Sequence, residues 1–360
     1  MTDGELIDIP ALAARIRPAD AAAAAEAQQL LDAKTKPRRS LGRLEDLVCH
    51  LAAIRGVGSP PASRLTKAIV VMGADHGVAA EGVSAYPQEV TGQMLLNFAR
   101  GGAAINVLAR QANARIVVVD MGVAHPPPER AEIRTRRIGP GTANFTRGPA
   151  MTRTQALTAL STGATIAGAL ARDGVGLIGI GDMGIGNTTA SSALAAVFTG
   201  APPEEVTGRG TGIDDATFKR KVDVVRRGLE VNRPDPSDAV DALAKVGGFE
   251  IAGLAGVALG AAVASVPVVV DGFIASVAAL AAVRIAPDAA GYLIASHRSV
   301  EAGHRLVLKA LGKIPLLDLD LRLGEGTGAA LAMLLVDSAL AIAAEMATFE
   351  SAGVSDQPKR

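Results

Sequence analysis

The chain has 360 residues with 36 Lys plus Arg and 36 Asp plus Glu, so its formal net charge is zero and no basic excess is available to hold a polyanion. Aromatic residues make up only 2% of the chain and Trp is absent, so we expect no nucleic-acid partner. The single Cys49 excludes an intrachain disulfide, and the first residues, MTDGELIDIP, lack a basic and apolar signal pattern, so we expect a cytoplasmic protein.

The amino-terminal segment predicts two helices, over 11–33 and 41–54, separated by the basic turn KTKPRRS. A third periodic segment, over 329–349, predicts a helix near the other end of the chain. We expect both ends to form one small helical domain, 1–62 with 329–360, and the segment between them, 63–328, to form a second domain that carries the active site.

From Leu65 onward, short β-branched runs that end in glycine or an acid alternate with long segments rich in Ala and Leu. This alternation predicts an α/β fold, a Rossmann-like parallel sheet flanked by helices. The expected strands cover 68–72, 116–120, 176–180, 266–270, 292–295 and 315–319. Open parallel sheets bind ligands at the carboxyl ends of their strands, so one rim should unite the turns at 73–77, 120–122, 181–189, 271–272, 296–301 and 324–328.

The stretch 251–270 carries no charge and is about as long as a membrane span. It is rich in Gly and Ala and is broken by Pro267, after which three valines run into Asp271 as a buried strand would. We therefore predict a buried helix followed by a core strand.

A glycine-rich loop, GDMGIGNTT, begins at Gly181. Residues 179–184 formally give the dinucleotide fingerprint G-x-G-x-x-G, but no acid ends a second strand at the distance that a dehydrogenase needs. Read from Gly181, the loop gives a Walker A frame with Asn187 in place of the lysine, which disfavours a nucleoside triphosphatase. Glycines followed by a helix that opens near Asn187, Thr188 and Thr189 indicate a phosphate monoester site. The alternative is a tight turn with a threonine cap.

A second glycine loop, TGRGTGIDD from Thr207, precedes a helix that Asp214 and Asp215 would cap. A lysine one to two turns further on, Lys219 or Lys221, would supply the positive charge that Asn187 lacks. For each of these basic residues the alternative is simple solvation at the surface.

The third loop, GEGTG from Gly324, presents Glu325 just before a long apolar helix. A carboxylate held there suits a general base or a group that stabilises a developing cation, and the alternative is an acid that only complements the helix dipole. His76 and His297 fall on the predicted rim, but no H-x-x-x-H or C-x-x-C spacing exists, so we expect orienting hydrogen bonds and no metal site.

The chain resembles the nicotinate mononucleotide:dimethylbenzimidazole phosphoribosyltransferases of cobalamin nucleotide-loop assembly, and the resemblance covers most of its length. Eight ordered blocks carry it: KPRRSLGRLEDL, ADHGVAAEGVSAYPQEVTGQM, GGAAINVLA, GDMGIGNTTASSAL, GRGTGIDD, VDGFIASVAAL, SHRSVEAGH and GEGTGAALAM. The resemblance implies a Rossmann-like domain, a small bundle made from both chain ends, and a homodimer in which the small domain helps to close the neighbour's site. It also implies transfer of the 5-phosphoribosyl group from nicotinate mononucleotide to 5,6-dimethylbenzimidazole, with inversion and without metal or cofactor.

Carried over residue by residue, the resemblance assigns three groups of site residues. The catalytic base falls on Glu325, with Asp182 as the second catalytic carboxylate. The nucleotide and its phosphate would be held by Gly184, Ile185, Gly186, Asn187, Thr188, Lys221, Ser299 and Glu301. The base pocket would be lined by Ser84, Tyr86 and Gln93.

This chain departs from the family pattern at two places. The family has Glu where this chain has Asp182, and a proline-glycine pair where it has Arg38 and Arg39. Because the shorter Asp182 retracts the carboxylate by one methylene, we assign it to orientation rather than to direct proton transfer.

Two other functions compete. A Mg²⁺-dependent phosphoribosyltransferase that uses phosphoribosyl diphosphate pairs adjacent acids after its strand, whereas Asp318 and Asp320 are separated by Leu319. A non-catalytic nucleotide sensor or carrier would use the same phosphate loop and would bind the nucleotide tightly without releasing nicotinate.

Overall fold

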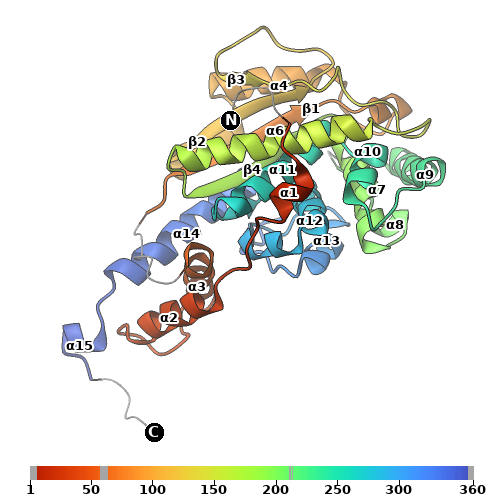
Figure 1. Ribbon diagram of the computed structural model, residues 1–360. Coiled ribbons are helices and arrows are strands. Elements are labelled where there is room, and N and C mark those ends of the chain that lie inside the picture. The colour runs from red at the N-terminus through yellow and green to blue at the C-terminus, as the bar shows by residue number, and fades with distance from the viewer. Residues whose placement is uncertain (1–5, 57–63, 211, 213, 356–360) are drawn as a thin grey trace.

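The computed structural model describes residues 6–56, 64–210, 212 and 214–355, and its centre is a six-stranded parallel sheet (Figure 1). The strand order is β3-β2-β1-β4-β5-β6, and every neighbouring pair is parallel. The strands are β1 Lys67–Ala74, β2 Ala114–Gly122, β3 Ile133–Thr135, β4 Leu177–Met183, β5 Val268–Val270 and β6 Leu293–Ala295. This is the order of doubly wound sheets. Strands are added on one side of β1 first and then, from β4 onward, on its other side, and the ligand crevice of such sheets lies outside the point where the order reverses.

The α/β prediction is confirmed, and five of the expected strands match β1, β2, β4, β5 and β6. The strand expected over 315–319 is wrong, because this segment forms only one isolated bridge, between Leu317 and His297. Asp320 has a left-handed φ of 52°, which ends any extended run at this point. The short edge strand β3 was not predicted, since only Ile133 of its three residues is buried and no apolar run marks it.

Helices cover both faces of the sheet, so each face forms a hydrophobic core. Because side chains alternate along β1, Val70 and Met72 pack in the core on one face, whereas Ile69 and Val71 pack in the core on the other. The first core contains α6 Arg153–Arg172, α11 Phe249–Val263 and α12 Phe273–Ile285, and the second contains α4 Glu89–Arg100, α5 Ala104–Gln111 and α14 Thr327–Glu345. The other elements are η1 Gly77–Glu81, α7 Asn187–Thr199, α8 Pro203–Val206, α9 Asp215–Asn232, α10 Ala239–Val246, η2 Pro287–Tyr292 and α13 His304–Leu311.

The uncharged stretch 251–270 forms most of α11 and the strand β5, as predicted. α11 is buried and crosses α6 closely, because a methyl group on Gly163 would lie 1.8 Å from the carbonyl oxygen of Gly253. By length and composition α14 is compatible with a membrane span, but 56% of its most apolar window is buried inside the molecule, as in a core helix.

The helices α2 Ala21–Asp32 and α3 Arg43–Arg55 of the amino-terminal segment lie beside α14, which belongs to the carboxyl-terminal segment (Figure 1). The helices α2 and α3 pack together, and α3 also packs on α14. Lys34 Nζ donates to the Met346 carbonyl oxygen at 2.6 Å, and Phe349 N–H, at the start of α15 Phe349–Ala352, donates to the Ala33 carbonyl oxygen at 3.0 Å. These contacts bring together the segments expected to form a small helical domain, but the expected boundary at 62/63 lies outside the described residues.

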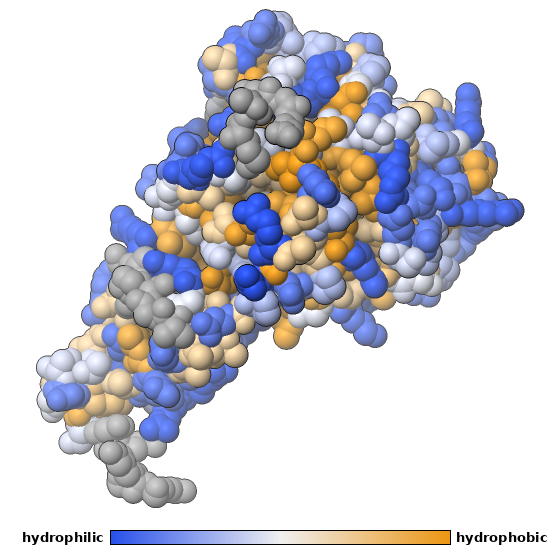
Figure 2. Space-filling view, in the orientation of Figure 1, coloured by the Kyte–Doolittle hydropathy of each residue, from blue (hydrophilic) through white to orange (hydrophobic). Residues whose placement is uncertain are grey.

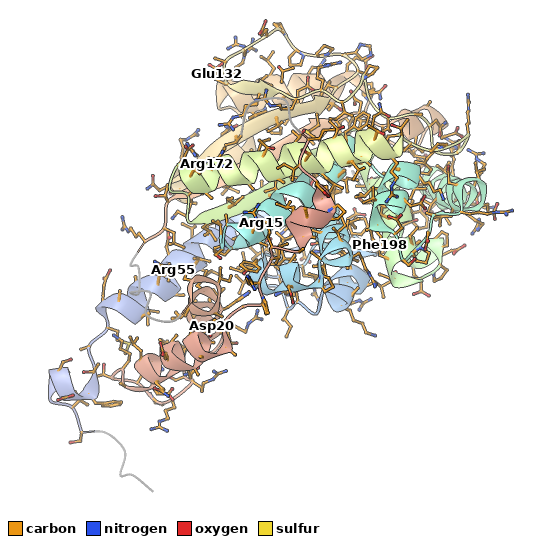
Figure 3. All side chains as sticks on the ribbon, viewed as in Figure 1. Arg15, Asp20, Arg55, Glu132, Arg172 and Phe198 are labelled. Carbon is orange, nitrogen blue, oxygen red and sulfur yellow. The ribbon has the colours of Figure 1, made fainter. Side chains whose placement is uncertain are left out.

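The single helix expected over 11–33 is wrong. The structure has α1 Ile9–Ala13 and α2, and the chain between them contains Pro18, which cannot continue a helix. Asp20, labelled in Figure 3, opens α2 by accepting hydrogen bonds from Ala22 N and Ala23 N. α1 packs on α6 and α11 of the sheet domain rather than on α2 or α3. In the space-filling view, apolar residues gather near the centre of this face, in the region of α1 and α6 (Figure 2).

Candidate active site

The two glycine-rich loops identified in the sequence are in direct contact. Gly181 lies within β4, and a methyl group on it would lie 2.2 Å from the backbone nitrogen of Gly326. Glu325 N–H donates to the Asp182 carbonyl oxygen at 3.3 Å. Only glycine at 181 permits this approach, so the loop before α14 sits on the carboxyl end of β4.

Glu325 is held in a left-handed conformation with φ of 64°, between Gly324 at 82° and Gly326 at 90°. For a residue with a Cβ this conformation costs about 1–2 kcal/mol, so the surroundings must enforce it, as they often do at functional sites. The side chain is buried and its Oε2 has no hydrogen-bond partner in the described structure. Burial raises the pKa of Glu325, and the Ile105 N–H at the start of α5 opposes that shift. The carboxyl group is therefore placed to accept a proton.

Asp182, near the end of β4, is the second buried carboxyl group of the site. Its Oδ2 accepts from Asn187 Nδ2 at 2.9 Å, whereas its Oδ1 meets no partner among the described residues. Burial raises the pKa of Asp182 well above its ordinary value, and the carboxylates of Asp271 and Glu250 raise it further. Asp182 is thus tied to the first residue of α7 and keeps one free oxygen, as an orienting group requires.

The loop 184–188 joins β4 to α7 and has the form of an anion site. Gly186 is the N-cap of α7 with φ of 93° and offers no capping side chain, so the threonine cap considered for this turn is wrong. Ile185 N–H is bound to Thr91 Oγ1 and Asn187 N–H to the Gly184 carbonyl oxygen. The N–H groups of Gly186 and Thr188 meet no acceptor within the described part of the chain, so they are available to a ligand.

Lys221 comes to this loop from α9. Its Nζ donates to Thr188 Oγ1 at 2.9 Å and to the Gly208 carbonyl oxygen at 3.1 Å. Burial lowers the pKa of Lys221 to about 8, and the nearby Glu301 carboxylate opposes that shift. Lys219 and Arg220 are exposed instead, on the hydrophilic end of the molecule where α9 lies (Figure 2). Of the basic residues considered for this role, the structure thus places Lys221 beside the loop 184–188.

The remaining parts of the predicted α9 loop agree only in part with the structure. Asp214 caps α9 by accepting from Thr217 N–H at 2.8 Å, and Asp215 is the first helical residue. Positions 211 and 213 of the loop lie outside the described residues.

Ser299 and Glu301 lie next to the Lys221 side of the site. A methyl group on Gly208 would lie 1.9 Å from Glu301 Oε2, so this carboxylate packs against the backbone that Lys221 binds. Ser299 N–H donates to His304 Nδ1 at 2.9 Å, and His304 Nε2 bonds to Ser276 Oγ at 2.9 Å. The neutral ring of His304 therefore holds the Ser299 turn, a role that the sequence did not predict.

The three residues expected in the base pocket follow η1. Tyr86 N–H donates to Ser84 Oγ at 3.2 Å, Tyr86 is 53% exposed, and Gln93 is exposed on the first half of α4. The structure records no contact between these residues and Glu325. Their role in the base pocket stays a prediction.

Sequence reasoning missed a group of buried residues that support the loop 184–188. Thr91 Oγ1 donates to Asp75 Oδ1 at 2.6 Å while accepting from Ile185 N–H, so Asp75 is linked to the loop through Thr91. His76 Nε2 lies 2.7 Å from Glu250 Oε1, and Gly184 and Gly186 pack against the His76 side chain. The available signal was Glu250 itself, an acid in an otherwise apolar helix, because such residues are seldom buried without a partner.

The two rim histidines make orienting contacts, as expected. His76 pairs with Glu250, and His297 Nδ1 bonds to Ser296 Oγ at 3.0 Å. Across the described ranges, no group of three or more His, Cys, Asp or Glu residues is arranged to hold a metal ion.

The site therefore has two chemically different ends. One end has two free backbone N–H groups and a buried lysine, which suit a phosphate. The other end has the buried carboxyl groups of Asp182 and Glu325, each with an oxygen that has no partner among the described residues, which suit proton transfer or a developing positive charge.

Comparisons with known proteins identify the family. A phosphoribosyltransferase family model matches residues 16–354. A nicotinate-nucleotide-dimethylbenzimidazole phosphoribosyltransferase of Roseiflexus sp. (strain RS-1) is 57% identical over 343 residues, 95% of this chain and 96% of that protein. The enzyme of the same name from Geobacter sulfurreducens is 52% identical over 342 residues, 95% of this chain and 97% of its own length. The crystal structure of the enzyme of this name from Thermus thermophilus superposes with a TM-score of 0.87 at 47% identity, over 94% of this chain and 100% of that one.

Proposed function

The chain belongs to this phosphoribosyltransferase family, and we propose that it transfers the 5-phosphoribosyl group from nicotinate mononucleotide to 5,6-dimethylbenzimidazole. The products are α-ribazole 5'-phosphate and nicotinate. The curated relatives carry the name of this reaction over nearly the whole chain, which supports the substrate pair.

One observation carries the assignment of roles within the site. The loop that bears Glu325 rests on the strand that leads into the phosphate loop, through the hydrogen bond from Glu325 N–H to the Asp182 carbonyl oxygen at 3.3 Å. A nucleotide anchored by its 5'-phosphate at Gly186 and Thr188 would therefore have its sugar close to the Glu325 carboxyl group. A base and a phosphate site that meet in this way favour reaction at the anomeric carbon.

On the nucleotide side, the phosphate would accept hydrogen bonds from Gly186 N–H, Thr188 N–H and Lys221 Nζ. Burial lowers the pKa of Lys221 to about 8, and a bound phosphate dianion would keep it protonated. Ser299 and Glu301 would line the ribose from the Lys221 side. This binding places the reacting carbon without covalent help from the protein.

On the base side, a ring nitrogen of dimethylbenzimidazole donates its lone pair to C1' while the bond from C1' to the pyridinium nitrogen breaks. The bonding pair returns to that nitrogen, so nicotinate leaves with a neutral ring, and attack from the opposite face inverts C1'. The other ring nitrogen gives its N–H proton to Glu325. Asp182 would orient the ribose.

We propose that this displacement needs no metal and no cofactor. Metal ions usually assist such transfers by neutralising charge on a leaving group, and a pyridinium that departs as a neutral ring develops no negative charge there. We also propose that Ser84, Tyr86 and Gln93 contact the base.

We propose further that residues from both chain ends form a small helical domain, and that a homodimer in the cytoplasm shares its active sites. The exposure of Tyr86 and Gln93 is consistent with a site that a second subunit completes.

The test is direct. Purified protein is incubated with nicotinate mononucleotide and dimethylbenzimidazole in the presence of EDTA, and α-ribazole phosphate and nicotinate are quantified by liquid chromatography. We expect both products in equal amounts. Folded protein that binds the nucleotide without releasing nicotinate would identify a sensor or carrier, and a requirement for Mg²⁺ and phosphoribosyl diphosphate would identify the metal-dependent class.

A further inference from the structure

Asp271 is a buried carboxylate on the rim to which no role has yet been given. It follows β5 directly and is 1% exposed. Its Oδ2 accepts from Gly326 N–H at 2.9 Å, and its Oδ1 accepts from Gly328 N–H at 2.7 Å and from Ala329 N–H at 3.2 Å. One side chain that follows β5 therefore binds three backbone donors of the loop and helix that follow Glu325.

These bonds replace a cap that the sequence of the loop lacks. The N-cap of α14 is Gly326, which has no side chain, so the loop itself offers no capping group to the first turn of the helix. Asp271 supplies that acceptor from a neighbouring strand, and a negative charge at a helix N-terminus is favourable in itself. Asp271 therefore binds the N–H of Gly326, the residue that follows Glu325. The N–H of Glu325 itself binds the Asp182 carbonyl oxygen, so the backbone is held at both peptide groups of Glu325.

Glu325 is consequently held from both sides in a backbone conformation that a free chain would avoid. The bond from Glu325 N–H to the β4 backbone, at 3.3 Å, is long, whereas the bonds that the Asp271 carboxyl group accepts from Gly328 N–H and Gly326 N–H, at 2.7 and 2.9 Å, are short. The attachment to Asp271 is the stronger of the two.

We propose that Asp271 is a positioning residue for the transfer reaction, which fixes the loop so that the Glu325 carboxyl group faces the reacting carbon. This inference rests on the proposed function and adds a residue that acts through Glu325. The printed hydrogen bonds of the Asp271 carboxyl group to this loop and helix all come from backbone N–H groups.

The charge of Asp271 has a second effect on the site. It is the largest contribution, after burial, to the raised pKa of Asp182, and so it favours the protonated form of that neighbour. By raising the pKa of Asp182, Asp271 favours a site in which Glu325 accepts the proton and Asp182 only orients the sugar.

The experiment is a double-mutant cycle of Asp271→Asn and Glu325→Gln, with turnover and nucleotide affinity measured for all four proteins. If Asp271 acts through Glu325, the asparagine variant should lower kcat by about 10-fold or more in the natural background and by no more than about 2-fold when Glu325 is already glutamine, since residues that act as a unit are non-additive. The Kd for nicotinate mononucleotide should change little. Asp271→Ser, which leaves space instead of a mispaired amide, is measured beside it and should behave alike.

Asp238→Asn is the control for the loss of a helix cap. Asp238 is the N-cap of α10, and its Oδ1 accepts from Val240 N–H and Asp241 N–H, both at 3.0 Å. We expect both variants to lose thermal stability and only the Asp271 variant to lose a large part of kcat.

Equal losses of kcat from Asp271→Asn in both backgrounds, or equal losses of kcat in the Asp238 and Asp271 variants, would overturn the positioning role. No product from the natural protein would instead refute the proposed function, so the two failures are distinguishable.

Discussion

Replacing Glu325 by glutamine changes one oxygen of the side chain for an amide and leaves its size and its left-handed backbone in place. Glu325 is only 5% exposed and its Oε2 has no partner among the described residues, so water has little access to take over its role as proton acceptor. A general base contributes about 10²–10⁴-fold to a rate. We expect kcat to fall at least about 100-fold, equivalent to about 2.7 kcal/mol of transition-state stabilisation.

The assay follows nicotinate release and α-ribazole phosphate formation at saturating base, and calorimetry gives the Kd for nicotinate mononucleotide. That Kd should be unchanged, because the phosphate loop and Lys221 lie at the other end of the site. Glu345→Gln, at the exposed far end of the same helix, is the matched control and should leave kcat unaltered.

The pH profile separates a base from a structural acid. Because the pKa of Glu325 is raised from 4.5, turnover of the natural protein should fall as the pH drops through that raised value, since only the ionised form accepts a proton. The glutamine variant should lack this limb. Turnover within a few-fold of the natural protein would show that Glu325 is not the base.

Three further outcomes follow from the same geometry. Lys221→Met should weaken nucleotide binding by about 10–100-fold with a smaller change in kcat, as expected for a lost charged hydrogen bond, and an unchanged Kd would exclude Lys221 from phosphate binding. Because its pKa is raised, Asp182 keeps its proton in the folded state at pH values where the unfolded state has lost it, so the free energy of unfolding should fall as pH rises above about 4. Asp182→Asn should flatten this pH dependence of Tm in melting curves between pH 5 and 8. Parallel curves for the two proteins would contradict a buried, protonated acid. Gly181→Ala places a methyl group 2.2 Å from Gly326 N and should lower turnover and Tm. Gly168→Ala is the control, because its methyl group meets nothing closer than 3.5 Å, and it should leave turnover unchanged. A Gly181 variant with full activity would show that the two loops need not be in contact.

Several features of the site lower the stability of the folded protein. Glu325 adopts an unfavourable φ of 64°, and burial raises the pKa of three carboxyl groups, those of Asp182, Asp271 and Glu325. Removing such groups commonly stabilises a protein at the expense of activity. Their presence together at the ligand end of the sheet supports a catalytic use rather than a structural one.

Much of this arrangement could be predicted from the sequence. The alternation of β-branched runs with Ala-rich segments specifies a parallel α/β sheet, because each strand must be buried on both faces. The glycines of GDMGIGNTT and GEGTG predict tight turns before helices, and those turns led us to predict an anion site and a presented acid. Pro18 and the capping residue Asp20 also indicate the break between α1 and α2. This local signal, rather than the apolar periodicity around it, determines where the helices end and begin.

Other features depended on contacts between segments far apart in the chain. No local pattern indicates that the carboxylate of Asp271 caps α14, because the helix it caps begins 56 positions later in the sequence, at Thr327. The choice of Lys221 over Lys219 followed from the side of α9 that packs against Gly208, and the edge strand β3 exists only because β2 offers it a partner. Local propensity and turn chemistry therefore determined the elements and the two loops, whereas the partners of each buried polar group were decided by tertiary packing, which alone sets the distances over which hydrogen bonds and charges act.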